Sequence, residues 1–350
     1  MSNPAISISS PLPFGGLREN TGRIAPGVLL AAGIAGAAFF LRLLPGLAVF
    51  SAMIIATLLG MIVRNVAGTP AWAQPGVTFG VKKILRFAII LLGFQLMVPQ
   101  IVEVGLAGVA IIMATLVTTF VFTKWLGRVM GVDARLAELI GAGTSICGAS
   151  AVIATNTVTR GRDEDVAYAV ATVTVFGSLS MFVYPLLPHL LALGPRAFGL
   201  WSGASIHEIA QVVASSFQDG AVAGRFATVA KLTRVMMLAP FVMALGVMAS
   251  RRSVAVGDGA PHAAPPMPWF VLGFVALVLV NSVVTVPPVT KGWIVFATTF
   301  LLSLALAAMG LETDFRKLRA KGLKPLGLAA AAWIFISVFS LVLVQISAYA

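Results

Sequence analysis

A short polar stretch interrupts the apolar middle of this chain. Residues 141–157 read GAGTSICGASAVIATNT, with glycines, hydroxyls and a thiol where a membrane helix would carry leucine. Glycine weakens a helix, so we expect a discontinuous helix that restarts near residue 148. The free N–H groups and the positive dipole end of the restarted helix would bind an anion without a charged side chain. The expected substrate-binding residues are Gly143, Thr144, Ser145, Cys147, Gly148 and Ser150, with Ser205 from a later segment.

Close helix packing is the alternative interpretation of this stretch. Small residues let two membrane helices approach closely. This explains the glycines and alanines, but it explains the hydroxyls of Thr144, Ser145 and Thr155 less well. The two interpretations are compatible with each other.

Two basic residues fall inside a later apolar segment. Lys231 and Arg234 are three residues apart, so they share one face of a helix. A planar guanidinium and a point-charge ammonium suit an oxyanion, which predicts a cationic clamp for the substrate. The alternative is that both side chains extend to the outer membrane interface.

His207 and Glu208 are the residue types that could carry a proton through the membrane. Ionisable side chains within membrane spans are costly and mark functional sites. We assign this pair to coupling or gating, together with Asn156 and Gln211 along a polar path. A polar pair within a helix–helix contact is the alternative.

These residues must be positioned by membrane helices. The 350 residues are 59% hydrophobic and only 10% charged, against about 25% charged in soluble domains. A span needs about 20 mostly apolar residues. The sequence predicts an all-α polytopic membrane protein with eleven spans, at 25–41, 46–63, 79–98, 103–123, 134–157, 165–188, 197–217, 224–249, 268–286, 293–311 and 322–346.

Basic residues predict the orientation of the chain. With a cytoplasmic N-terminus, 17 of the 24 Lys and Arg residues fall on the inside and 5 on the outside. This asymmetry is the positive-inside pattern, so the net charge of +12 requires no nucleic-acid partner. We expect residues 1–23 to form a disordered cytoplasmic tail, residues 24–350 to form one transmembrane domain, and the C-terminus to lie outside.

Two internal pairings suggest repetition. Residues 91–112 resemble 306–329 and lie in the opposite orientation in the span count, as in inverted-repeat transporters. Residues 143–154, GTSICGASAVIA, align with 203–214, GASIHEIAQVVA, with five of the twelve positions identical. The span count gives the second pair the same orientation, so the two pairings conflict.

Four motifs together resemble a known family. They are GAGTSICGASAVIA, SGASIHEIAQVVA, KLTRVMMLAP and GLKPLGLA. Over nearly the whole chain, these motifs are similar to the sulfate exporter family of bacterial inner-membrane proteins. The resemblance implies export of sulfate or a small sulfonate. The region 309–328 also looks like bile-acid/sodium symporter relatives, which implies a ten-helix inverted-repeat core with broken helices; the eleventh span departs from that plan.

The sequence therefore predicts a secondary transporter of a small oxyanion in the inner membrane. The alternative is a cation/proton antiporter that uses Glu208 and His207. We expect no enzyme activity, catalytic residue, metal or cofactor, since no nucleophile motif or P-loop is present. The expected partners are a small anion, the lipid bilayer and a coupling proton or sodium ion, with self-association left open.

Overall fold

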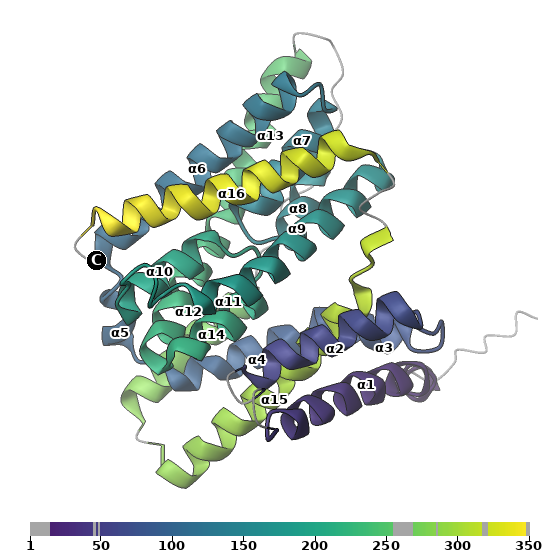
Figure 1. Ribbon diagram of the computed structural model, residues 1–350, viewed down its shortest axis with the longest axis vertical. Helices are drawn as coiled ribbons and strands as arrows, with labels where there is room; N and C mark the ends of the chain where they lie inside the picture. The colour runs from purple at the N-terminus through teal and green to yellow at the C-terminus, as the bar shows by residue number, and fades with distance from the viewer. Residues whose placement is uncertain are drawn as a thin grey trace, which may run out of the picture.

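The computed structural model describes residues 15–44, 47, 50–254, 269–284, 286–316 and 321–347, which contain helices and no strand (Figure 1). Its α-helices are α1 Gly15–Leu41, α2 Ala52–Val66, α3 Gln74–Phe79, α4 Leu85–Leu92, α5 Val98–Val102, α6 Gly105–Val129, α7 Ala134–Ser145, α8 Ala149–Thr159, α9 Asp163–Val183, α10 Pro195–Ser205, α11 Ile209–Ser216, α12 Ala221–Met236, α13 Leu238–Val254, α14 Trp269–Val283, α15 Pro288–Glu312 and α16 Leu323–Gln345. A π-helix, Gly80–Ile84, joins α3 to α4.

The described residues of each predicted span are mostly helical, which confirms an all-α membrane protein. Within the described ranges, six stretches are long and apolar enough to cross a membrane. They are Gly22–Leu41, Gly105–Val129, Asp163–Leu186, Ala221–Met248, Pro288–Glu312 and Leu323–Gln345. Two shorter apolar helices are α2 and α14. The predicted tail is shorter than expected, because α1 begins at Gly15. The Leu-Arg-Glu that follows consists of good helix formers. Residues 1–14 lie outside the described residues.

The fifth predicted span is a helical hairpin. Thr159 donates a hydrogen bond of 2.8 Å to Glu138, and Arg135 donates one of 3.1 Å to the carbonyl of Arg160. Deeper in the protein, a Cβ on Gly143 would lie 2.7 Å from Val152. These pairs place α8 antiparallel to α7. The chain therefore enters along α7, turns at residues 146–148 and leaves on the same side; we name residues 134–159 hairpin 1.

The seventh predicted span is also a hairpin. The hydroxyl oxygens of Ser202 and Ser216 are 2.7 Å apart. In a continuous helix, fourteen residues would separate them by about 21 Å. Helix α12 confirms the return of the chain, because it runs parallel to α10: Gly199 packs on Ala223 and Gly203 on Ala227. We name residues 195–216 hairpin 2.

The two hairpins approach each other from opposite ends of α9. Helix α9 follows hairpin 1 and precedes hairpin 2 in the chain. Gly143 of hairpin 1 packs on Val173 of α9, and His207 and Gln211 of hairpin 2 pack on Gly177. Two of the eleven predicted spans are thus re-entrant segments, which end on the side where they begin.

Because of the two hairpins, two loops lie on the opposite side of the membrane from the one that the span count predicts. Lys321 forms ion pairs with Asp165 and, at 3.6 Å, with Glu164, so the loop after hairpin 1 adjoins the basic segment before α16. On the opposite side, Arg196 lies 3.4 Å from Glu103. In the resulting topology, two basic residues that were counted outside lie on the predicted cytoplasmic side, and one that was counted inside lies outside. The split of Lys and Arg between the inside and the outside therefore changes from 17 to 5 into 18 to 4. The corrected topology strengthens the positive-inside pattern.

The helices form two bundles (Figure 1). Helices α6, α9, α12 and α16 surround the hairpins, and we call this group the hairpin bundle. Helices α1, α2, α4, α14 and α15 pack together as the second bundle. Helix α11 contacts α2 and α15 across the boundary. The backbone N–H of Ser51 donates a hydrogen bond of 2.8 Å to Gln218, which follows α11.

Candidate functional site

The tips of the two hairpins meet inside the protein. Tip 1 comprises residues 146–148 and tip 2 comprises residues 206–208. The backbone N–H of Ala149 donates a long hydrogen bond of 3.4 Å to the carboxylate of Glu208. The tips are sixty residues apart and occupy matching positions in the repeat of 143–154 with 203–214. That pairing therefore reflects shared structure, and the opposite directions of the hairpins remove its conflict with an inverted repeat.

The other pairing, 91–112 with 306–329, includes residues 317–320, which lie outside the described residues. In both of its members a helix precedes the turn and another follows it. These are α4 and α6 in the first, and α15 and α16 in the second. Helices α6 and α16 pack against each other.

Gly148 shapes tip 1, and the predicted restart of the helix at this residue is confirmed. Its φ of 69° lies in the left-handed region, where glycine is unstrained. A Cβ at this position would also lie 2.5 Å from Cγ of Glu208. Glycine thus allows both the reversal of hairpin 1 and the close approach of the Glu208 side chain.

Lys231 joins the two tips. Its side chain is fully buried, and Nζ donates hydrogen bonds of 2.8 Å to the carbonyls of Ile146 and Ile206. Ile146 follows α7 and Ile206 follows α10, so each carbonyl lies at the negative end of a helix. One ammonium group on α12 therefore holds both hairpins.

Arg234 makes a second set of contacts with backbone carbonyls of the two hairpins and shares that of Ile206 with Lys231. Its Nε donates to Ser145 at 2.6 Å, its Nη1 to Ile206 at 3.1 Å, and its Nη2 to the carbonyl of Thr144. The side chain is fully buried, as is that of Lys231. Extension of these side chains to the membrane interface is therefore wrong. In this structure both cations contact backbone carbonyls, and they position the tips.

The two buried cations have no ion-pair partner among the described residues. Burying an unpaired charge is costly, and helix dipoles offset only part of that cost. Glu208 is the carboxylate whose charge acts on Lys231. The tips consequently carry more positive than negative charge.

Glu208 lies where two helices begin. It is the N-cap of α11, and its side chain accepts a hydrogen bond from the backbone of Gln211. The same carboxylate accepts from Ala149, the first residue of α8. The positive ends of α8 and α11 thus converge on one carboxylate. The side chain is half-buried, and the neighbouring Ser150 is exposed.

Gln211 connects this site to two other helices. Its amide nitrogen donates to the carbonyl of Thr174 at 3.1 Å and to Ser178 at 3.2 Å, both on α9. It also contacts the sulfur of Met309 on α15, in the second bundle, at 3.8 Å. Polar residues of α9 were absent from the sequence prediction, since single hydroxyls in apolar helices are common and carry little signal.

The remaining predicted residues differ in their positions. His207 is buried at tip 2, and its Nδ1 has no hydrogen-bond partner in the described part of the chain. Ser205 donates to the carbonyl of Trp201 in its own helix at 2.6 Å. Asn156 accepts from the backbone of Gly161 at 2.7 Å. Asn156 therefore stabilises the end of α8, about two turns from the tip, and its place in a polar path stays a prediction.

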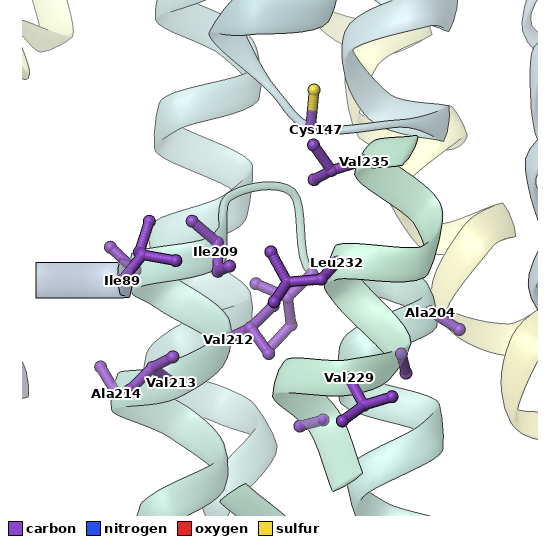
Figure 2. Close-up of a cluster of buried hydrophobic side chains, with 14 of the residues drawn as sticks. Ile89, Cys147, Ala204, Ile209, Val212, Val213, Ala214, Val229, Leu232 and Val235 are labelled. Carbon is purple, nitrogen blue, oxygen red and sulfur yellow. The ribbon is translucent and has the colours of Figure 1, made fainter. Parts of the chain in front are cut away.

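Apolar side chains enclose the tips. Figure 2 shows Cys147 of tip 1 beside Val235, with Leu232 and Val229 further along α12. Ile209 of α11 belongs to the same buried cluster. A surrounding of low polarity strengthens the electrostatic interactions of the charged groups at the tips.

A pocket of about 340 Å³ lies between hairpin 2 and the second bundle, near the loop before α2. Gln95, Gln218 and Thr298 line it with polar side chains. Its other lining residues are Arg42, Ser51, Ala52, Met53, Leu92, Val213, Phe217, Val295, Thr299 and Leu302. The far arm of hairpin 2 thus borders a space that the tips do not fill.

These features define a polytopic membrane protein with two re-entrant hairpins that meet at a buried, positively charged centre. Residues 26–329 match the family described as conserved hypothetical protein 698, and the chain belongs to this family. It is 40% identical over 320 residues to the UPF0324 inner membrane protein YeiH of Salmonella typhi, covering 89% of this chain and 91% of the relative. It is 41% identical over 325 residues to the UPF0324 membrane protein PA5383 of Pseudomonas aeruginosa, covering 89% and 92%. No solved structure matches significantly.

Proposed function

We propose that the protein is a secondary transporter that carries a small oxyanion, sulfate or a small sulfonate, across the bacterial inner membrane. The observation that carries this proposal is the pair of fully buried cations, Lys231 and Arg234, at the meeting point of two hairpin tips. Helices α8 and α11 begin at the same point. An anion bound there would meet the N-terminal ends of two helices and a positive field.

The charges of the site favour an anion over a cation. Each helix end carries about half a unit charge, so the two N-terminal ends and the two C-terminal ends cancel. Lys231 and Arg234 contribute two positive charges, and ionised Glu208 contributes one negative charge. One positive charge remains without compensation. It would repel sodium or another cation, which argues against the antiporter alternative.

The topology supports transport by alternating access. The hairpins enter from opposite sides and share one binding centre, as expected for a carrier whose site opens to each side in turn. The two bundles contact each other through α11, next to the pocket between them. Movement of the hairpin bundle against the second bundle would open that boundary. With the N-terminus in the cytoplasm, hairpin 1 would enter from the cytoplasmic side.

The test is a measurement of transport currents in proteoliposomes on a solid-supported membrane. Concentration jumps of sulfate, sulfite, sulfoacetate, taurine and chloride are each applied with and without a pH gradient. We expect a current with one class of oxyanion that Arg234→Gln abolishes. The exposed cation of Lys291 serves as a control, and Lys291→Gln should retain the current.

A different pattern would overturn the proposal. Currents with sodium against protons, and none with any of the anions, would support the antiporter that uses Glu208 and His207. Anion currents that persist unchanged in both Lys231→Gln and Arg234→Gln would remove the cations from the mechanism.

A further inference from the structure

A carboxylate already lies at the point where an anion would bind. Oxygen Oε1 of Glu208 is 3.4 Å from the first N–H of α8, and the same side chain caps α11. Both helices have at least eight residues, so both have a developed N-terminal dipole. The positive ends of two helices are thus satisfied by a group of this chain itself.

A buried polar atom beside the carboxylate has no partner. His207 is 1% exposed, yet its Nδ1 makes no hydrogen bond to any described residue. Buried polar atoms are usually paired, so an unpaired one marks a place for an absent ligand or water. Glu208 is the adjacent residue and is half-buried, while Ser150 at the start of α8 is exposed. The carboxylate is therefore partly accessible at the tip, and the residue before it carries a buried nitrogen without a hydrogen bond to the described residues.

The following inference rests on the proposed function. We propose that the carboxylate of Glu208 occupies the anion-binding position when no transported anion is bound. The ionised carboxylate and the substrate bind in turn at the start of α8. When the substrate binds, the displaced carboxylate takes one proton from water and becomes a neutral acid. One proton then crosses the membrane in the same direction as each anion.

The surrounding charges give the physical reason. Lys231 on α12 and Glu312 on α15 act on the Glu208 carboxylate, and Arg234 on α12 acts on the neighbouring Lys231 and His207. The thiol of Cys147 lies on tip 1, and α9 contributes the uncharged Thr174. With two buried cations, the site is neutral with a protonated Glu208 and a dianion. An ionised Glu208 beside a dianion would leave an excess negative charge in an apolar surrounding, which is costly.

The experiment compares charge movement with substrate flux. Radiolabelled sulfate or sulfoacetate uptake into proteoliposomes is measured at a clamped membrane potential, together with the charge moved. Each of these anions carries two negative charges, so wild-type protein should move one negative charge per anion. Because Glu208→Gln cannot take up a proton, its ratio should rise by one charge for the same anion. The control Glu103→Gln, at the surface and far from the tips, should keep the wild-type ratio.

Equal charge ratios in wild type and Glu208→Gln would overturn the inference while the anion transporter stands. A wild-type protein that carries neither anion nor binds either one would overturn the proposed function, and the inference with it. Should Glu208→Gln fail to fold, proton uptake by wild-type protein decides the question. Mixing with anion in weak buffer at mildly alkaline pH, where the carboxylate is ionised before binding, should take up close to one proton per anion bound, and no uptake would refute the exchange.

Discussion

The hydroxyl groups of Ser202 and Ser216 lie 2.7 Å apart, although a continuous helix would separate them by several turns. This contact shows that the chain reverses within hairpin 2. Hairpin 1 reverses in the same way between Glu138 and Thr159. The sides of the connecting loops follow from these two reversals.

Cysteine labelling tests the sides of the loops. Position 162 follows hairpin 1, and we expect Arg162→Cys to react with a membrane-impermeant maleimide from the same side as Ala71→Cys. Both positions are exposed, and the buried Cys147 is first replaced by serine. Eleven full crossings would instead place them on opposite sides. Arg196→Cys, which follows the other end of α9, should react from the side opposite to Ala71→Cys.

Gly148→Ala should strongly impair anion binding. An added Cβ would strain the positive φ, at a cost of roughly 1–3 kcal/mol, and would displace the Glu208 side chain. Because the Cβ also fills space at the start of α8, where the anion would bind, we expect at least about a tenfold loss of anion affinity, which corresponds to about 1.4 kcal/mol. Isothermal titration in detergent measures this. Gly33→Ala in α1, where nothing lies within 4 Å, is the matched control and should bind as wild type.

Arg234→Gln should destabilise the protein as well as abolish transport. The change removes donors from the carbonyls of Thr144, Ser145 and Ile206, which stay buried. A buried carbonyl left without a donor costs about 1–3 kcal/mol. Thermal unfolding followed by the fluorescence of the six tryptophans should show a lower Tm. Arg234→Lys should not restore it, because an ammonium lacks the planar fork; full rescue by lysine would contradict the positioning role.

Cross-linking the two bundles should stop transport but not binding. Ser51 of the second bundle contacts Gln218 at the end of hairpin 2, with a hydrogen bond of 2.8 Å. In a Cys147→Ser background, Ser51→Cys with Gln218→Cys should react with a short cleavable bifunctional thiol reagent. We expect the linked protein to bind anion without carrying it, and cleavage to restore the flux. Undiminished flux in the linked protein would exclude movement along this boundary.

The sequence predicted the break at Gly148, because glycine clusters weaken a helix wherever they occur. It did not predict the reversal of the chain, since a break looks the same whether the chain continues or turns back. Together α7 and α8 supply enough apolar residues for one crossing, so hydropathy could not distinguish the two cases. The repeat of residues 143–154 with 203–214 carried the missing information, because matching breaks sixty residues apart required matching structures.

The site was predicted in part for a similar physical reason. The spacing of Lys231 and Arg234 placed them on one face of a helix, and residue type marked both as unusual in a membrane. Their partners are backbone carbonyls of residues 144–146 and 206, which are free only because both hairpins turn there. Whether a backbone carbonyl is free to accept a hydrogen bond from a side chain depends on where the folded chain turns, and the residue types alone do not reveal this.

The hydrogen bonds of Lys231 to Ile146 and Ile206 bear on leakage through the membrane. Because one ammonium group binds both tips, neither hairpin can withdraw from the centre without losing its own hydrogen bond to Lys231. In the proposed carrier, the contact that positions the site would therefore also hold both hairpins closed against leakage of small ions at rest.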